Sequence, residues 1–365
     1  MSMNRRQFLE LTASLAATPL AGSCSSSDIK LIENLPLSTY GKIATAEEVT
    51  AGIDLTGKIA VVTGCNSGIG YETMRVLALR GAHVIGTGRD LDKAGTACAS
   101  VTGQTTPVVL ELADLQSAAD CAGQIRDMVP HIDMLIGNAG MIAGVELEQI
   151  DGIEKTFVVN HLGHFVFINR LLDRVKAARQ GRVVMVSSGA AFGGAGIEFD
   201  NLAGARDYDR RRSYSQSKLA NALFSLELAD RLKGTSATAN ALHPGVINTN
   251  IVRNEPGYIQ VLFNTVGSLF TKTIAQGAAT TCYVATSPQL AGVSGYFFMD
   301  CNPISLSGPN HLYDQAMARQ LWQVSEQLTA KYLTVAELSN PHPVPVTSVL
   351  MPAFTGGPGL ARMTD

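Results

Sequence analysis

The sequence has few of the features that mark disulfide-rich, metal-binding or nucleic-acid-binding proteins. Its six cysteines are scattered over 365 residues with no CxxC pair, so neither a disulfide framework nor a zinc-ligand spacing is indicated. Only 16% of the residues are charged and the formal net charge is -3, which gives no reason to expect nucleic-acid binding. Beyond the N-terminus no apolar run is long enough to cross a bilayer. The hydrophobic fraction of 46% is ample for a large buried core.

The first 24 residues have the pattern of an export signal. Arg5 and Arg6 precede a modest apolar run, Phe8–Ala21, which is too short for a membrane span. NRRQFL is similar to a twin-arginine signal, which exports folded proteins. The small residues before Cys24 resemble a lipoprotein processing site. We expect an exported protein, either periplasmic or attached to a membrane only through a lipidated Cys24. The alternatives are a disordered basic arm or an unused signal, which would leave the protein in the cytoplasm.

Composition divides the rest of the chain into three segments. Residues 25–45 include a serine run and indicate a linker. Residues 46–333 are long enough to form one folded domain with a substantial core. The tail, residues 334–365, holds several prolines and glycines and is predicted to be extended or disordered.

Between residues 59 and 87 the sequence has the pattern strand, glycine-rich turn, helix, strand. Ile59–Thr63 is a short β-branched run suited to a buried strand, and the helix pattern that follows ends at Gly81. The turn between them carries Gly64, Gly68 and Gly70. Such a turn brings backbone amides and a helix N-terminus against a pyrophosphate, so it predicts dinucleotide binding. The alternative is a turn that needs glycine only for its own geometry.

Arg89 and Asp90 follow the second strand, His83–Thr87, at the place where a dinucleotide-binding fold meets the adenosine ribose. An arginine there can pair with a 2′-phosphate, whereas an acid accepts the 2′-hydroxyl group. Arg89, with Lys93 as a helper, therefore favours NADP(H) over NAD(H), and Asp90 keeps NAD(H) open. Arg89 could instead stack on the adenine or face solvent.

Apolar strand patterns recur along the chain, most of them separated by stretches with helical periodicity. They are Pro107–Leu112, Ile132–Gly137, Arg182–Ser188, Thr238–His243 and Gly295–Asp300. This alternation predicts parallel strands joined by crossover helices, which is an α/β fold with a single doubly wound sheet. Ligands bind such sheets at the carboxyl ends of the strands, so we expect the functional residues at that edge.

Tyr214 and Lys218 lie four residues apart in RRRSYSQSKLAN, so on a helix they share one face. An ammonium beside a phenol lowers the pKa of the phenol, which would make Tyr214 an acid/base group near neutral pH. The alternative is an ordinary surface pair. His161 and His164 are three residues apart but have no acidic or cysteine partners in sequence, so we expect packing histidines and no metal site.

Several motifs together resemble the short-chain dehydrogenase/reductase family. They are TGCNSGIG, GNAG, VNHLGHF, VVMVSS, YSQSK and HPGVINTN, in the order and spacing of that family. The leader AEEVTAGIDLTGKIAVVTG and the late LWQVSEQLT look most like its retinol-dehydrogenase-like branch, which lies close to the light-dependent protochlorophyllide reductases. The resemblance covers about residues 46–333. It implies a Rossmann fold and an enzyme that acts on CH–OH donors with NAD(P) as acceptor.

The resemblance also implies roles for single residues. Tyr214 would be the general acid/base, and Lys218 would tune this phenol and bind the nicotinamide ribose. Ser188, with Ser187 as runner-up, would bind the substrate oxygen, and Asn160 would hold a water in a proton relay, although an asparagine there could also bond its own helix backbone. The implied cofactor-binding residues are Gly64, Asn66, Ser67, Gly68, Ile69, Gly70, Arg89, Glu111, Leu112, Asn138, Ala139, Gly140, Tyr214, Lys218, Pro244, Gly245, Val246 and Thr249. The family more often has an aspartate in place of Glu111.

Two segments bear on the substrate. Ala195–Arg212 resembles an insert of the retinol-dehydrogenase-like branch, and its three final arginines either bind an acidic group or form a solvated face. Asn250–Thr273 lies where the family has a mobile lid, and its apolar character favours a hydrophobic alcohol, aldehyde or ketone unless these side chains only pack the lid. A C=C reductase of the protochlorophyllide-reductase type and a non-catalytic dinucleotide-binding sensor are the alternative functions. A homo-oligomer is compatible with the sequence.

Overall fold

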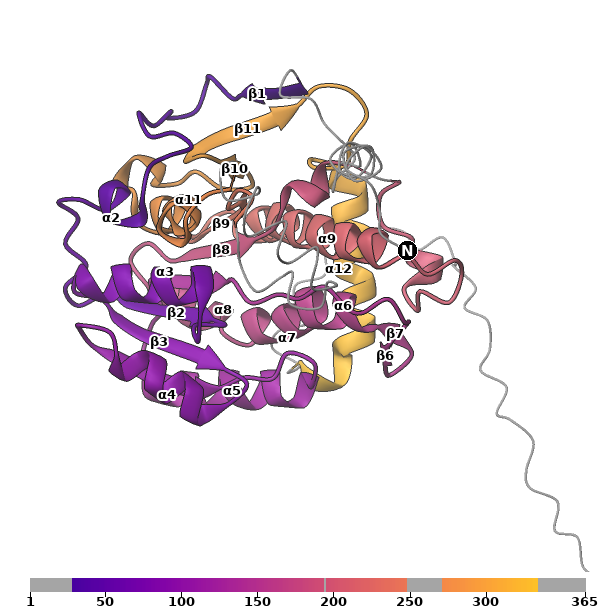
Figure 1. The fold of residues 1–365 in the computed structure, drawn as a ribbon, viewed down its shortest axis with the longest axis horizontal. Helices are drawn as coiled ribbons and strands as arrows, with labels where there is room; N and C mark the ends of the chain where they lie inside the picture. Colours follow the sequence, from indigo (N-terminus) through magenta and orange to yellow (C-terminus); the bar gives the residue numbers. More distant parts are fainter. Residues whose placement is uncertain (1–27, 194, 248–270, 334–365) are drawn as a thin grey trace, which may run out of the picture.

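A nine-stranded sheet runs through the molecule in the order β1-β11-β10-β9-β8-β5-β2-β3-β4, with helices on both faces (Figure 1). The computed structural model describes residues 28–193, 195–247 and 271–333. The strands from β10 to β4 are parallel; at one edge β11 pairs antiparallel with β10, and β1 in turn pairs antiparallel with β11. The strands of the sheet are β1 (Ile29–Leu31), β2 (Ile59–Thr63), β3 (His83–Gly88), β4 (Thr105–Val109), β5 (Met134–Gly137), β8 (Arg182–Val186), β9 (Thr238–His243), β10 (Phe297–Met299) and β11 (Asn302–Leu306), and a separate hairpin pairs β6 (Gln149–Ile150) with β7 (Ile153–Glu154).

The inner strands are buried on both faces, as parallel strands covered by helices must be. Every residue of β8 is buried, and β2 and β3 are buried beyond their first residues. Their continuous apolar, β-branched runs are what this position requires. The predicted α/β doubly wound sheet is confirmed, and the predicted strand ends differ from the observed ones by at most three residues.

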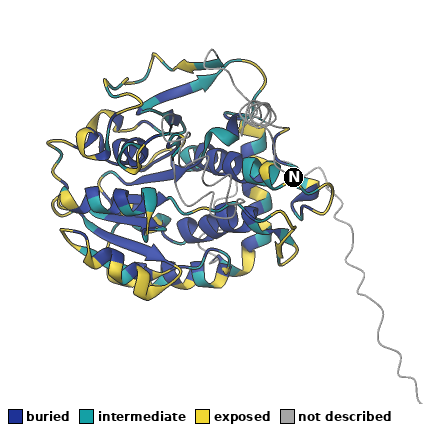
Figure 2. Cartoon of the chain, in the orientation of Figure 1, coloured by how far each residue is buried: buried dark blue, intermediate teal, exposed yellow. Residues whose placement is uncertain are grey.

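Two apolar cores lie on opposite faces of the sheet. One packs α2, α3, α4 and α11 against the strands, and the other packs α5, α7, α9 and α12; Figure 2 shows buried residues concentrated in the strands and along the inner faces of the helices. Within the described ranges, no helix combines the length and apolar character that a membrane span requires. The helices are α2 (Ala46–Val49), α3 (Gly68–Leu79), α4 (Leu91–Ala99), α5 (Leu115–Met128), α6 (Lys155–Phe157), the π-helical turn η2 (Val158–Leu162), α7 (Gly163–Asn169), α8 (Leu172–Ala177), η3 (Gly189–Phe192), η4 (Phe199–Asn201), α9 (Arg210–Arg231), α11 (Ile274–Thr286), η7 (Pro288–Leu290), α12 (Gln315–Thr329) and η8 (Ala330–Tyr332).

Helix α12 covers the outer side of α9 with aromatic contacts. Trp322 stacks on Phe224, with the ring centroids 5.4 Å apart and the planes within 1° of each other. The guanidinium carbon of Arg231 lies 4.2 Å from the centre of the Trp322 ring, a cation–π contact. With the sheet on one side and α12 on the other, every residue of α9 from Ser217 to Leu228 is buried. The helix is therefore a firm support for the side chains at its N-terminal end.

The prediction of a linker at residues 25–45 is wrong for the described part of that segment. Strand β1 pairs with β11, and the side chain of Asn302 accepts the Ser38 amide at 2.9 Å and donates to the Tyr40 carbonyl at 3.1 Å. The unpaired N–H and C=O groups of an edge strand can bond with the backbone of any neighbouring strand, whatever its side chains. A short polar segment can therefore pair with β11 and join the sheet. The predicted export signal and C-terminal tail lie outside the described residues.

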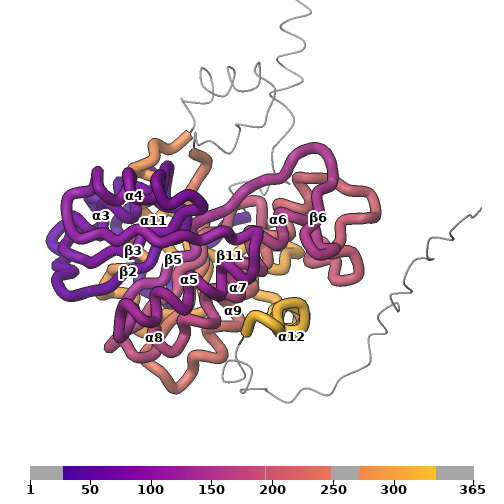
Figure 3. Tube along the Cα trace, turned by 90° about the horizontal axis from the view of Figure 1, so that it is seen from below, coloured from indigo at the N-terminus to yellow at the C-terminus, as the bar shows by residue number. Residues whose placement is uncertain are grey.

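The β6–β7 hairpin and the insert after η3 lie side by side and project from the body (Figure 3). The amide of Glu154 donates to the Leu202 carbonyl at 2.8 Å, and the side-chain amide of Gln149 donates to the Ala203 carbonyl at 2.6 Å. These bonds order the insert against the hairpin, next to the start of α9.

Candidate active site

Helix α9 brings Tyr214 and Lys218 to the carboxyl end of β8. The helix starts where the Asp209 carboxylate accepts the Arg212 amide at 2.7 Å, a standard N-cap. The Lys218 ammonium nitrogen lies 5.8 Å from the centre of the Tyr214 ring and donates to the Val186 carbonyl at 3.1 Å. Only 4% of Lys218 is exposed, and burial lowers its pKa from 10.5 to about 8. The phenol and a destabilised ammonium are thus held on one side of the same helix.

Of the two serines after β8, Ser188 is the one beside the phenol. Burial raises the pKa of Tyr214, and a hydrogen bond with Ser188 offsets part of that rise. Ser187 is turned away, because its hydroxyl donates to the Lys218 carbonyl at 2.6 Å and is buried. The prediction that Lys218 lowers the pKa of Tyr214 is not met in this structure: burial raises the pKa, and the group that offsets part of this rise is the Ser188 hydroxyl and not the Lys218 ammonium.

Asn160, in η2, fixes the turn that lies against Lys218. Its side-chain oxygen accepts the Met141 amide at 2.8 Å, and its side-chain nitrogen donates to the Met141 carbonyl at 2.8 Å and to the Ser217 hydroxyl at 2.9 Å. The side chain therefore bonds neither its own helix backbone nor Lys218 directly. Gly140 sits next to this clamp, and a Cβ atom there would lie 3.1 Å from the Lys218 nitrogen.

The glycine-rich loop has the form that a dinucleotide needs. A Cβ atom on Gly70 would lie 2.2 Å from the Gly64 carbonyl oxygen and 2.4 Å from the Asn138 side-chain nitrogen, so only glycine fits. Gly64 itself has a φ of 71°, which favours glycine. The side-chain oxygen of Asn66 is buried and has no hydrogen-bond partner among the described residues, and Ser67 makes no side-chain cap at the start of α3. An unpaired acceptor and a helix N-terminus without a side-chain cap suit a ribose hydroxyl and a phosphate, so these residues fit NAD(P).

At the adenosine end of the loop, Arg89 is exposed. Asp90 is used as a helix cap, because its carboxylate accepts the Lys93 amide at 3.1 Å and pairs with the Lys93 ammonium at 3.3 Å. The carboxylate of Glu111 is also used locally and accepts the Ala113 amide at 2.9 Å. The arginine is thus better placed than either acid to meet an incoming group.

The remaining predicted cofactor residues that the structure describes occupy the first turn of α3, the turns after β5 and β9 and the segment after β4. They are Gly68, Ile69, Leu112, Asn138, Ala139, Pro244, Gly245 and Val246. Thr249 and residues 250–270 of the predicted lid lie outside the described residues. Sequence reasoning missed Thr63, whose hydroxyl oxygen accepts the amides of Asn138 and Ala139 at 2.9 Å each. The available signal was a polar residue ending a buried strand directly before the glycine turn.

Both histidines of the VNHLGHF motif have protein partners. His161 lies 2.8 Å from the Ser325 hydroxyl, and burial lowers its pKa to about 3. His164 lies between the Thr63 hydroxyl at 2.9 Å and the Asn160 carbonyl at 3.0 Å. Across residues 28–193, 195–247 and 271–333, no group of three or more His, Cys, Asp or Glu side chains is placed to hold a metal ion.

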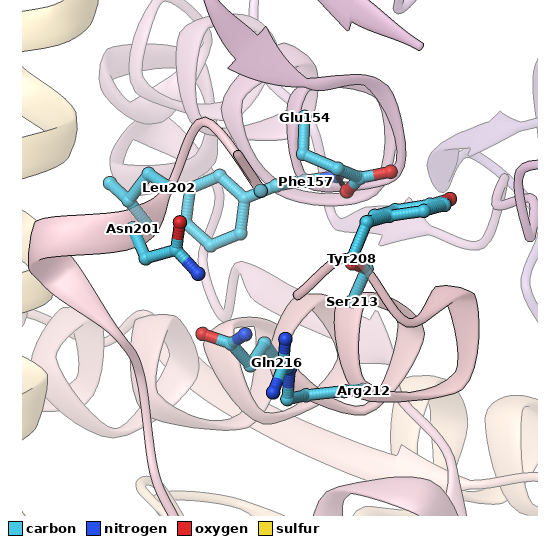
Figure 4. Close-up of a pocket in the computed structure, with 9 residues that line it drawn as sticks. Glu154, Phe157, Asn201, Leu202, Tyr208, Arg212, Ser213 and Gln216 are labelled. Carbon is cyan, nitrogen blue, oxygen red and sulfur yellow. Dashed lines mark hydrogen bonds between the residues drawn. The ribbon is translucent and has the colours of Figure 1, made fainter. Parts of the chain in front are cut away.

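A cavity of about 20 Å³ lies beside α9, between the hairpin and the insert (Figure 4). Its carboxylate, Glu154, accepts the Thr156 and Phe157 amides at 2.9 Å each, and Arg212 on its rim pairs with Glu198 at 3.6 Å. The volume admits about one water molecule, so this cavity is part of the support of the insert and not a substrate site. It is lined by Glu154, Phe157, Asn201, Leu202, Gly204, Tyr208, Arg212, Ser213 and Gln216.

Comparison with known proteins agrees with this geometry. Residues 58–258 match the family model described as short chain dehydrogenase. The chain therefore belongs to the short-chain dehydrogenase family of NAD(P)-dependent oxidoreductases.

Two sequence relatives and two solved structures show which members of the family this chain is similar to. Human retinol dehydrogenase 14 is 39% identical over 290 residues, which cover 74% of this chain and 85% of that protein. The chloroplastic short-chain dehydrogenase TIC 32 B of Brassica napus is 39% identical over 307 residues, covering 80% and 94%. A crystal structure of an uncharacterized protein from Mycobacterium Paratuberculosis has a TM-score of 0.62 at 35% identity, covering 79% of this chain and 97% of that one. The RhlG/NADP active-site complex of Pseudomonas aeruginosa has a TM-score of 0.55 at 25% identity, covering 67% and 95%. The predicted family and its retinol-dehydrogenase-like character are confirmed.

Proposed function

We propose that the protein is an NADP(H)-dependent oxidoreductase that interconverts a hydrophobic alcohol and the corresponding carbonyl compound. The observation that carries the proposal is the grouping of Tyr214, Ser188 and Lys218 at the sheet edge that also carries the glycine-rich loop. The similarity to a retinol dehydrogenase supports an apolar alcohol as substrate.

Tyr214 serves as the proton donor in the reductive direction. Because burial raises its pKa, the phenol stays protonated at neutral pH and can give its proton to the substrate oxygen. The Ser188 hydroxyl holds the same oxygen and stabilises the negative charge that develops on it. When bound, NADPH would supply the hydride to the carbonyl carbon. Lys218, an ammonium below its pKa of about 8, binds the nicotinamide ribose and helps to return a proton to the phenol.

Arg89 supports the preference for NADP(H). Its exposed guanidinium can pair with a 2′-phosphate, whereas the neighbouring Asp90 carboxylate is used as a helix cap. Replacement of Arg89 with alanine should weaken NADPH binding by roughly tenfold or more and change NADH binding little. Arg179→Ala is the matched control, because this exposed arginine lies between α8 and β8, at the amino end of the strand and so away from the carboxyl ends that carry the site. Equal losses for both cofactors would contradict the assignment.

The reaction is tested with a panel of apolar aldehydes, ketones and conjugated enones, followed by NADPH absorbance with NADH in parallel. Tyr214→Phe should lower turnover by roughly a hundredfold or more and leave NADPH binding close to that of the wild type. If the products are reduced at C=C and not at C=O, the protein is instead a C=C reductase of the protochlorophyllide-reductase type. If its biological output survives Tyr214→Phe, the protein is instead a non-catalytic dinucleotide-binding sensor.

We further propose that residues 1–24 export the protein after it has folded around NADP(H). The basis is the arginine pair Arg5 and Arg6 ahead of an apolar run, together with the scarcity of free nicotinamide cofactor outside the cytoplasm. Replacing both arginines with lysine should leave the protein in the cytoplasm, and Cys24→Ser should release any membrane-attached fraction. Extracytoplasmic protein that holds no cofactor and takes none up would refute this route.

A further inference from the structure

His164 is a buried side chain that the reaction described above does not use. It lies in α7 with 1% of its surface exposed. One ring nitrogen, Nε2, lies 2.9 Å from the Thr63 hydroxyl at the end of β2. The other, Nδ1, lies 3.0 Å from the Asn160 carbonyl oxygen in η2. The ring thus bridges strand β2, which leads into the glycine loop, and the π-helical turn η2, whose Asn160 side chain holds residue Met141 near Lys218.

The bonds around Thr63 fix where the imidazole proton sits. The Thr63 oxygen accepts the amides of Asn138 and Ala139, both at 2.9 Å. A hydroxyl has a single hydrogen to donate, and His164 Nε2 is the acceptor within reach. Nε2 is therefore unprotonated, and Nδ1 carries the hydrogen and donates it to Asn160. The neutral form is favoured because burial lowers the pKa of His164 to about 4, with a smaller contribution from the charge of Lys218.

These bonds close a ring around residues 138–141. Thr63 holds the start of this turn through two amides, and the Asn160 side chain holds its end through the amide and carbonyl of Met141. His164 joins Thr63 to Asn160 and so completes the ring. Gly140, inside it, faces the Lys218 ammonium so closely that a Cβ atom would lie 3.1 Å from the nitrogen. A shift of either anchor, Thr63 or Asn160, would therefore move Gly140 relative to the Lys218 ammonium.

We propose that His164 is a positioning residue that couples the dinucleotide-binding turn to the proton-delivery site. One neutral ring fixes the positions of both anchors. Its acceptor nitrogen Nε2 holds Thr63 on the cofactor side, and its donor nitrogen Nδ1 holds Asn160 on the Lys218 side. This role rests on the proposed oxidoreductase function, because the two halves that it couples are the cofactor site and the acid/base pair.

Two substitutions separate the two nitrogens. The side-chain amide of asparagine overlays Nδ1, so His164→Asn keeps the donor to Asn160 and loses the acceptor for Thr63. The amide of glutamine overlays Nε2, so His164→Gln keeps the acceptor and loses the donor. We expect His164→Asn to weaken NADPH binding about tenfold while kcat at saturating cofactor stays within about threefold of the wild type. His164→Gln should show the reverse, with kcat about tenfold lower and NADPH affinity nearly unchanged.

His161→Gln is the control, because His161 is an equally buried histidine of the same motif that bonds only Ser325 among the described polar groups. It should lower the unfolding temperature, but it should not change NADPH affinity and kcat by different factors. Nitrogen-15 NMR of the wild-type imidazole should show an Nδ1–H tautomer that does not titrate above about pH 5. An Nε2–H tautomer, or equal losses of affinity and turnover in both His164 variants, would overturn the proposal. Because the tautomer is measured without turnover, an inactive wild-type protein would count against the proposed function and leave the NMR test standing.

Discussion

Lys218 should destabilise the fold in which it acts. Burial lowers its pKa from 10.5 to about 8, and this shift of roughly 2.5 units corresponds to about 3 kcal/mol against folding at neutral pH. Below pH 8 the folded and unfolded chains both carry the ammonium, so this cost is constant. Between pH 8 and 10.5 the folded chain has lost the proton and the unfolded chain still binds it, so stability rises with pH over that window.

The substitution Lys218→Met removes the charge and keeps a side chain of similar length. The Val186 carbonyl loses the lysine as a donor, which costs about 1 kcal/mol, but retains a longer bond of 3.5 Å from the Asn221 side chain. The variant should therefore unfold with a free energy about 2 kcal/mol higher than the wild type at pH 7. By pH 9.5 about 2 kcal/mol of the wild-type penalty has been relieved, and the difference should be close to zero.

Urea unfolding of the two proteins at both pH values measures this difference. Lys176→Met, which removes an exposed ammonium on α8, is the control and should change the unfolding free energy little at either pH. The variant should be inactive while being more stable, because the same buried charge serves catalysis. A Lys218→Met protein less stable than the wild type at pH 7, or a difference that does not shrink by pH 9.5, would refute the reasoning.

Further predictions concern the loop and the aromatic stack. Gly70→Ala should abolish dinucleotide binding in equilibrium titrations, because its Cβ atom would lie 2.2 Å from a backbone oxygen of the loop. Gly95→Ala, at a glycine in α4 with no atom within 4 Å of the added Cβ, should instead raise the unfolding free energy by about 0.5–1 kcal/mol; a loss of binding there as well would show that the contact distance at Gly70 is not the cause. Trp322→Ala should lower the unfolding free energy by about 3–5 kcal/mol in urea, because the ring is buried and stacked on Phe224; a loss under 1 kcal/mol would mean that α12 adds little to the support of α9.

The sheet and the glycine loop could be predicted because each has a local cause. A parallel strand covered on both faces must be apolar along its length, and β2 and β9 therefore match their predicted ranges residue for residue. The loop needs glycine where the chain turns against itself, as at Gly70. The pair Tyr214 and Lys218 could be placed on one face because helix periodicity is fixed by geometry.

Other features depend on contacts that no local pattern reveals. Strand β1 is three residues long with a lysine at its centre, and only its pairing with β11 makes it a strand. The direction of the Tyr214 pKa shift depends on how much water the fold removes from the phenol, and the spacing to Lys218 does not contain that quantity. Likewise, Asn160 and His164 were visible as polar residues in a helical motif, but their partners Met141 and Thr63 come from other elements.

The pairing of β1 with β11 has a consequence for biosynthesis. Ile29 lies opposite Leu306, so the earliest strand to leave the ribosome has no neighbour until nearly all of the chain has been translated. An incomplete polypeptide would keep this strand undocked, close behind residues 1–24, which we propose to be an export signal. Docking of β1 would then distinguish a folded chain from an incomplete one at a place next to that proposed signal.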